Sequence, residues 1–118
     1  MALRGIRGAT TAEQNSEEEI LNRTEELLSE IIAQNGLVIE DIASIIFSVT
    51  DDLDAVFPAK AARNLGWVYT PLFCTREIPV QGSLDRCIRV LMHVNTDRDQ
   101  KEMVPVYLHE AKKLRPDL

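Results

Sequence analysis

Apolar residues recur at helical spacing in one long segment of the chain. The face they share contains Ile20, Thr24, Leu27, Leu28, Ile31 and Ile32. Ser16 followed by Glu19 is typical of a capping box, in which the serine caps the helix and the glutamate reaches back to it. Three consecutive acidic residues in the first turn suit the helix dipole. We therefore predict an amphipathic helix that begins after Ser16 and ends at Asn35 and Gly36, a glycine C-cap.

Shorter segments rich in β-branched and apolar residues predict strands. We expect them at Ala2–Ala9, Ile42–Thr50, Val68–Glu77, Cys87–Val94 and Val104–Leu108. Cys87–Val94 is apolar on both faces, which predicts a central strand, whereas Pro71 indicates an edge or an irregular start for Val68–Glu77. A short helix over Phe57–Leu65 and a helical turn over Glu110–Leu114 complete the pattern. The order β-α-β-α-β-β-β predicts a single α+β domain.

Length and charge limit what the chain can do. A domain of 118 residues buries only about two-thirds of its unfolded surface, so we expect any sizeable pocket to be shared with another copy of the chain. The net charge of −6 argues against a nucleic-acid coat, because phosphate contacts need a basic surface. Residues 1–59 have 3 basic and 12 acidic side chains, and residues 60–118 have 10 and 7. The cationic second half suits a small anionic ligand, and pairing of the two halves across the fold explains the charges equally well.

Cysteine and histidine positions predict neither disulfides nor a metal site. Cys74 and Cys87 each lie in or beside an apolar stretch, which suits a reduced protein inside the cell. His93 and His109 fit no metal-ligand spacing. The N-terminal MALRGIRGATT has no apolar signal region, and no stretch of about 18 apolar residues occurs. We expect a cytoplasmic protein with no metal, no cofactor and no membrane span.

Two arginines stand out because they interrupt predicted strands. Arg7 lies between Ile6 and Gly8, and Arg89 shares a strand face with Cys87 in an otherwise apolar run. A guanidinium group stays charged at any physiological pH, so its burial requires an anionic partner or hydrogen-bond acceptors. An edge position or a structural ion pair is the alternative for each. Two such residues in one small sheet favour recognition of a carboxylate or phosphate.

Three further cations are weaker candidates. Lys60 and Arg63 lie three residues apart, so they share a helix face, a spacing more often found on a solvated surface. Arg115 lies close to the chain end, where charges usually belong to a frayed terminus. Spacing alone therefore does not assign these residues to a site.

The remaining candidates are a carboxylate, a thiol and a phenol. Glu77 follows Cys74 by three residues, so both reach one ligand only where the backbone bends. Cys74 alone is most often a small buried hydrophobe, and Tyr107 is equally a core phenol. The chain has no nucleophile elbow and no glycine-rich phosphate loop. Any enzymatic reaction would need neither a nucleophile nor a metal.

Four segments together resemble a known family. They are Arg4–Thr11 (RGIRGATT), Ala55–Ala61 (AVFPAKA), Cys87–Val90 (CIRV) and Leu114–Leu118 (LRPDL). In this order and at this spacing they resemble the monofunctional chorismate mutases of the trimeric Bacillus type. The resemblance covers nearly the whole chain. It implies that residues 1–118 form one chorismate-mutase-like domain with a mixed five-stranded sheet packed by two main helices.

The resemblance also implies an assembly and a reaction. The assembly would be a homotrimer around a barrel-like core, with active sites between adjacent subunits. The reaction would be the Claisen-type rearrangement of chorismate to prephenate, in the biosynthesis of phenylalanine and tyrosine. Such a rearrangement is pericyclic and needs no covalent intermediate and no cofactor. No nucleic-acid or membrane partner is expected.

Roles for individual residues follow from the same resemblance. Arg89 would lie beside the ether oxygen of the breaking bond, where negative charge develops. Glu77 would accept a hydrogen bond from the ring hydroxyl of the substrate, and Arg7 would bind a substrate carboxylate. These three are the expected catalytic residues. The other expected substrate-binding residues are Cys74 beside Glu77, Tyr107 beside Arg7, the cationic rim of Lys60, Arg63 and Arg115, and the apolar walls Phe57 and Leu114.

A function of another class fits the same motifs. A non-catalytic trimeric module could bind a small carboxylate metabolite between subunits without converting it. An acceptor for a ring hydroxyl, which the resemblance assigns to Glu77, favours the enzyme over a plain carboxylate binder. Consumption of chorismate, followed by its ultraviolet absorbance, separates the two functions.

Overall fold

A computed structural model describes residues 1–116 of the chain. Its strands and α-helices follow in the order β1 (Ala2–Thr11), α1 (Glu17–Asn35), β2 (Ile42–Val49), α2 (Ala59–Asn64), β3 (Leu72–Arg76), β4 (Cys87–Thr96) and β5 (Val106–Tyr107). Short 3-10 helices span Ile39–Asp41, Gln100–Glu102 and His109–Leu114. The predicted order β-α-β-α-β-β-β is therefore confirmed.

The sheet is mixed, as expected, and has the strand order β3-β2-β4-β1-β5. The central strand β4 pairs antiparallel with both β1 and β2. β3 joins β2 and β5 joins β1 in parallel, one at each edge. The central position predicted for Cys87–Val94 and the edge position predicted from Pro71 are both confirmed.

Helix α1 begins and ends where the sequence predicts. The Ser16 hydroxyl accepts a hydrogen bond from the Glu19 N–H at 3.1 Å, and Gly36 ends the helix in the left-handed region at φ +58°. The reciprocal half of the capping box is wrong, because the Glu19 carboxylate accepts from the Glu13 N–H at 3.2 Å. That backbone N–H is the main cause of a lowered pKa for Glu19, and the Arg23 guanidinium acts in the same direction.

Three other elements are shorter than predicted by more than one residue. Strand β5 spans only Val106–Tyr107 instead of Val104–Leu108. Helix α2 begins at Ala59 instead of Phe57, with Pro58 as its N-cap residue. Strand β3 begins at Leu72, because the chain turns at Gly66 (φ +89°) and leaves Val68 and Tyr69 exposed. The apolar composition of residues 68–71 therefore does not reflect pairing with a neighbouring strand.

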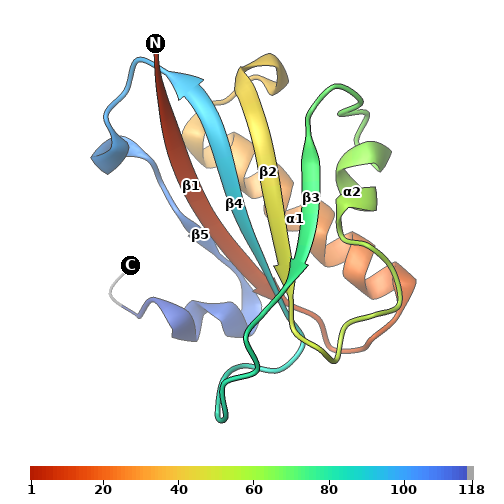
Figure 1. Cartoon of the computed structure of the whole chain (residues 1–118). Helices are drawn as coiled ribbons and strands as arrows, with labels where there is room; N and C mark the ends of the chain where they lie inside the picture. The colour runs from red at the N-terminus through yellow and green to blue at the C-terminus, as the bar shows by residue number, and fades with distance from the viewer. Residues whose placement is uncertain (117–118) are drawn as a thin grey trace.

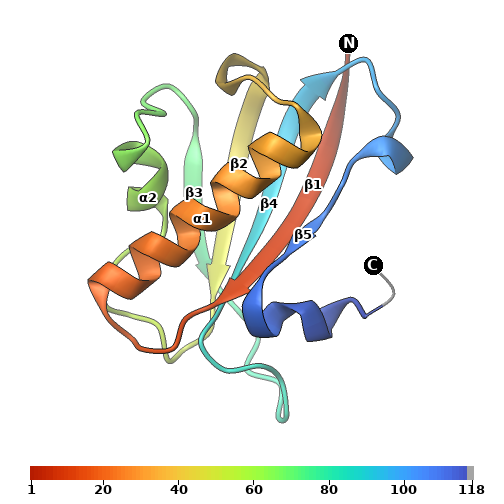
Figure 2. The same ribbon diagram turned by 180° about the vertical axis from the view of Figure 1, so that it is seen from behind.

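One face of the sheet lies against α1, which crosses it diagonally (Figure 2). Alternate residues of β1, β2 and β4 pack there against the apolar stripe of the helix. The fully buried members include Ile6, Leu27, Leu28, Ile31, Ile45, Phe47 and Met92. Helix and sheet approach closely at Gly8, where an added Cβ would lie 2.8 Å from Ile31 Cδ1. This packing explains why the strand has glycine at that position.

Neither α-helix covers the opposite face of the sheet (Figure 1). The other set of alternate residues lies on this face. Phe73 is 67% exposed, Leu3 57% and Leu91 37%. The polar residues among them include Arg7, Arg89 and His93, whose Nδ1 lies 3.0 Å from the Ser44 Oγ. We call this the uncovered face.

Candidate active site

Arg89 belongs to a row of residues that crosses the uncovered face from edge to edge. The strand register places Tyr107 opposite Ala9, and Ala9 opposite Arg89. On the other side of Arg89 the row continues through Ser48 to Thr75. All strands of the sheet contribute to this row, so side chains from residues 9 to 107 meet on one surface.

Arg7 lies in the neighbouring row, opposite Leu91. It is therefore the diagonal neighbour of Arg89 across the β1–β4 pair, at a spacing of about 7–8 Å between backbones. Both arginines are exposed in the single chain. Two long guanidinium side chains at this spacing can reach one dianionic ligand together. Neither arginine is therefore buried in the sheet of the single chain.

Arg89 forms an ion pair with Glu77. Its Nε lies 3.1 Å from the Glu77 Oε1, and the two side chains are 44% and 22% exposed. The Glu77 N–H donates to the Val49 carbonyl at 2.9 Å, which fixes the chain as it leaves β3. A guanidinium group has five N–H donors, so a pair through Nε leaves others for a ligand. The structural ion pair that the sequence left open as an alternative for Arg89 is therefore present, and the Arg89 side chain is still accessible to solvent.

A cavity of about 530 Å³ opens beside this pair. Its lining includes Thr50, Glu77, Ile78, Cys87 and Arg89. Burial raises the pKa of the Cys87 thiol above its ordinary value, and the nearby Arg89 charge opposes that shift without cancelling it. The cavity thus has a cation, a carboxylate and a neutral thiol at one end of the uncovered face.

A second group of predicted residues lies around the end of β3 and the start of α2. Phe57 and Cys74 line a cavity of about 590 Å³ with Leu53, Val56 and Thr75. Phe57 is 70% exposed. Lys60 and Arg63, both exposed, belong to the adjacent α2. This group offers an apolar wall with cations beside it.

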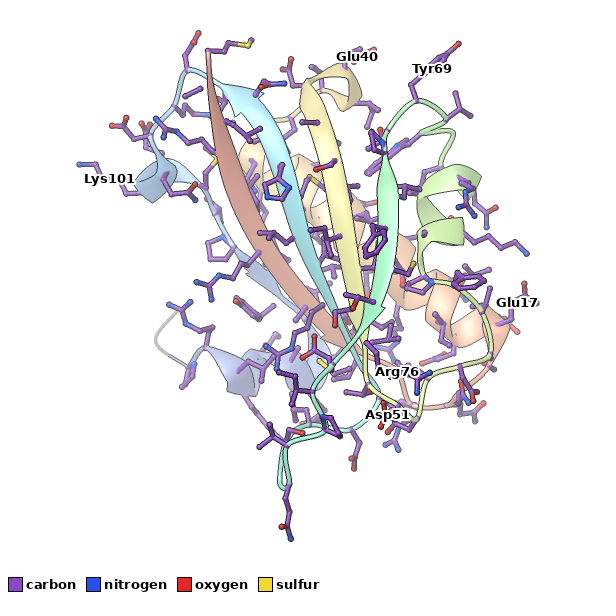
Figure 3. The ribbon with its side chains drawn as sticks, in the orientation of Figure 1. Glu17, Glu40, Asp51, Tyr69, Arg76 and Lys101 are labelled. Carbon is purple, nitrogen blue, oxygen red and sulfur yellow. The ribbon has the colours of Figure 1, made fainter. Side chains whose placement is uncertain are left out.

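We call the cavity lined by Glu77 and Arg89 the Arg89 cavity, and the cavity lined by Phe57 and Cys74 the Phe57 cavity. Among residues 1–116, the two linings share only Arg76. Arg76 Nη1 lies 3.4 Å from the Asp51 Oδ1, and Figure 3 shows the two side chains together at the end of β3. Cys74 and Glu77 therefore line different cavities, one on each side of this strand end. In the single chain, the residues around Arg89 and the residues around Phe57 therefore do not meet at one ligand.

A third location contains the C-terminal candidates. Tyr107 and Arg115 line a cavity of about 550 Å³ with Pro105, Leu108 and Lys112. Leu114 is the last residue of the 3-10 helix that precedes Arg115. Asp117 and Leu118, the end of the motif that includes Leu114 and Arg115, lie outside the described residues.

Two polar residues of the Arg89 row were not singled out from the sequence. Ser48 lies directly between Arg89 and Thr75 in the register. Strand alternation gave a signal for Ser48, because it lies one residue from the buried Phe47. Thr75 gave no comparable signal, since the length of its strand was overestimated.

Comparison with known proteins identifies the family of the chain. A model of the family described as chorismate mutase type I matches residues 3–118. The chain belongs to this family. Among relatives, Chorismate mutase AroH of Bacillus subtilis (strain 168) is 52% identical, and the alignment covers 100% of this chain and 94% of that protein. Chorismate mutase AroH of Thermus thermophilus is 50% identical, with 98% and 96% covered.

A solved structure shares the fold. Chorismate mutase from Clostridium thermocellum superposes with a TM-score of 0.91 at 58% identity, covering 92% of this chain and 97% of that one. Membership of a chorismate mutase family supports an isomerase over the non-catalytic carboxylate-binding module. Among residues 1–116, no helix is long and apolar enough to cross a membrane.

Proposed function

We propose that this isomerase converts chorismate to prephenate in a cleft formed by two copies of the chain. The observation behind this proposal is the division of the expected substrate residues between separate cavities. Glu77 and Arg89 line one, and Phe57 and Cys74 line the other. A neighbouring copy that brings its Phe57 cavity against the Arg89 cavity would complete the site.

The uncovered face supplies a reason for such an assembly. Apolar side chains exposed together on a sheet mark an interaction surface, and this face has Leu3, Phe73 and Leu91 exposed. We propose that three copies associate through it around a barrel-like core, each with residues 1–118 as one domain. The row of residues that includes Arg89 lies on the same face, so assembly and completion of the site would be one event. A cytoplasmic location remains a prediction from the sequence.

Arg89 would stabilise the charge that forms during the reaction. In the rearrangement one C–O bond breaks and one C–C bond forms within the same molecule. The ether oxygen gains negative charge as the enolpyruvyl group migrates. A guanidinium group fixed beside that oxygen interacts more strongly with the transition state than with the substrate, which is the requirement for acceleration. The ion pair with Glu77 at 3.1 Å would hold the guanidinium in place before the substrate arrives.

The other residues would position the substrate. Glu77 would accept a hydrogen bond from the ring hydroxyl, and Arg7 with Tyr107 would bind a carboxylate. From the neighbouring copy, Cys74 would lie beside Glu77, where the substrate ring binds. The cations Lys60, Arg63 and Arg115 would attract the dianion, and the apolar side chains Phe57 and Leu114 would hold its compact conformer. Positioning and electrostatics suffice here, since no proton is transferred.

Mixing two inactive variants tests the shared cleft. Arg89→Ala removes the charge at the breaking bond and should lower kcat/KM by at least about a thousandfold. Phe57→Asp puts a carboxylate where the dianion must bind and should also abolish turnover. The variants are unfolded together in denaturant, refolded in equal amounts and assayed by the loss of chorismate absorbance. If each site takes one half from each of two copies, about a quarter of the sites regain both native halves.

Refolding each variant alone provides the control and should give no activity. Activity in the mixture near a quarter of the native value supports a cleft between copies. A mixture as inactive as its components would overturn it, provided that native protein refolds with full activity under the same conditions. Arg89→Ala protein with native turnover would contradict the role of Arg89 separately.

A further inference from the structure

The loop between β1 and α1 is bonded to the segment that leads into α2. A single side chain, Asn15, makes three hydrogen bonds to that segment. Its Oδ1 accepts from the backbone N–H of Asp54 at 3.0 Å and from that of Ala55 at 3.1 Å. Its Nδ2 donates to the Asp54 Oδ1 at 2.8 Å. Both ends of one amide therefore hold Asp54, and its oxygen also holds Ala55.

The segment that Asn15 holds has no regular secondary structure between β2 and α2. Backbone hydrogen bonds fix it on either side, from the Leu53 N–H to the Thr50 carbonyl and from the Lys60 N–H to the Phe57 carbonyl. Between these points, the N–H groups of Asp54 and Ala55 both donate to Asn15. Asn15 thus supplies the link in the middle of an exposed stretch.

A second contact joins the same parts of the chain. The Glu17 Oε1 lies 2.8 Å from the Lys60 Nζ, and Figure 3 shows Glu17 at the start of α1. Asn15 holds the backbone of the segment, and Glu17 holds a side chain at its far end. The start of α1 is itself well fixed, because Ser16 caps it.

This segment supplies half of the residues that line the Phe57 cavity. Asp54, Ala55, Val56, Phe57 and Pro58 all line it. A loop that moves by about 1 Å at a substrate-binding wall loses affinity and orientation. Because Phe57 is 70% exposed in the single chain, packing within the chain does little to fix its side chain. The hydrogen bonds of Asn15 lie two and three residues before it.

We infer that Asn15 is a positioning residue for the reaction, which holds the wall formed by residues 54–58 in the conformation that receives the substrate. The inference rests on the proposed function, because it requires Phe57 and Lys60 to contact chorismate. Asn15 itself does not touch the reacting atoms. Its contribution is a wall that is already ordered when substrate binds.

The test compares binding with turnover and with stability. Asn15→Ala removes all three bonds and should raise KM about five- to tenfold, with kcat within about twofold of native, since the wall orients substrate without stabilising charge. The melting temperature should stay within about 2 °C of native, since the affected groups are exposed and water can replace the lost bonds. Gln14→Ala is the matched control, because Gln14 is an exposed neighbouring amide that makes no side-chain hydrogen bond within residues 1–116.

Reversing the polarity of the Asn15–Asp54 pair separates positioning from a general structural role. Asn15→Asp keeps an acceptor for the two N–H groups but sets a carboxylate against Asp54, so KM should rise as in Asn15→Ala. Adding Asp54→Asn restores a donor and an acceptor in reversed positions, and KM should return to that of Asp54→Asn alone. The four proteins form a cycle whose coupling reports the bond directly.

Three outcomes overturn the inference. They are an unchanged KM in Asn15→Ala, a loss of kcat at constant KM, and an Asn15→Asp defect that Asp54→Asn does not repair. The variant Lys60→Ala distinguishes failure of this inference from failure of the proposed function. If Lys60→Ala raises KM and Asn15→Ala does not, only the role of Asn15 is wrong. If neither affects KM, the segment lies outside the substrate site and the proposed cleft is wrong as well.

Discussion

The two faces of the sheet use the same strands for different purposes. On the face against α1, alternate residues such as Ile6, Phe47 and Met92 are fully buried within the single chain. On the uncovered face, their neighbours Arg7, Arg89 and Leu91 are exposed. The covered face forms the core of the domain, and the uncovered face has Arg7 and Arg89, two of the residues expected to act on substrate. Substitutions on the two faces should therefore be separable in experiment.

Among substitutions that separate the two faces without removing an expected catalytic residue, the largest expected effect is a charge placed on the uncovered face. Leu91→Asp puts a carboxylate in the proposed contact between copies, directly opposite Arg7, and burying that charge in the contact costs several kcal/mol. We expect a folded chain by circular dichroism, a mass of one chain by sedimentation, and activity lowered about a hundredfold or more.

Val38→Asp is the control for this effect. Val38 is also an exposed apolar residue, at 54%, but it precedes the 3-10 helix Ile39–Asp41 and lies away from the row of Arg89. It should leave mass and activity unchanged. A Leu91→Asp protein with the native mass and full activity would show that the uncovered face is not the contact between copies.

A smaller effect should distinguish two glycines of β1 that lie on opposite faces. Gly8→Ala adds a methyl group that would meet Ile31 Cδ1 at 2.8 Å, Leu27 Cδ1 at 3.2 Å and the Val106 carbonyl at 3.3 Å. Such overpacking should lower the free energy of unfolding by about 1–3 kcal/mol. Gly5→Ala meets only Leu91 Cδ1 at 3.5 Å, an ordinary contact.

Urea unfolding at one fixed protein concentration measures both glycine variants. Gly5→Ala should be neutral or slightly stabilising, because alanine loses less backbone entropy in a strand. Equal destabilisation by the two substitutions would contradict the difference between the faces.

The smallest expected effect concerns the end of the uncovered face. Cys87 lies on this face but is only 1% exposed, and burial raises its pKa. A raised pKa means that a smaller fraction of the thiol is ionised at a given pH, and the thiolate is the form that reacts with iodoacetamide. Cys87 should therefore resist iodoacetamide near pH 8 until the chain unfolds. Cys74, which is half-buried, should react first. Mass spectrometry of the tryptic peptides identifies the modified thiol, and prior modification of Cys87 in folded protein would contradict this burial.

The sequence was most informative where structure depends on near neighbours. The ends of α1 were predicted because Ser16 and Gly36 act on the adjacent turn. Alternation along β4 placed Arg89 on a different face from Val90 without knowledge of the partner strands. Residues 68–71 were assigned wrongly to a strand because β-branched composition does not report the turn at Gly66.

The site depends on contacts that sequence spacing does not encode. Glu77 reaches Arg89 although β3 and β4 are not adjacent in the sheet, because the chain passes the end of β2 after Arg76 before it enters β4 (Figure 1). Asn15 meets Asp54 across 39 residues of sequence. Both contacts follow from how loops close around the sheet. The spacing of three between Cys74 and Glu77 indicated opposite faces, but it did not indicate which cavity each residue would line.

Strand β4 has its core residues and Arg89 within the same ten positions. Val90, next to Arg89, is 3% exposed and packs in the core. Because adjacent residues of a strand share one backbone, any repacking beneath Val90 also displaces the guanidinium beside it. Evolution towards higher thermal tolerance and evolution towards faster turnover would therefore compete on this strand. Laboratory selection for both traits at once should accumulate its changes elsewhere, on the exposed face of α1 and in loops away from the two cavities.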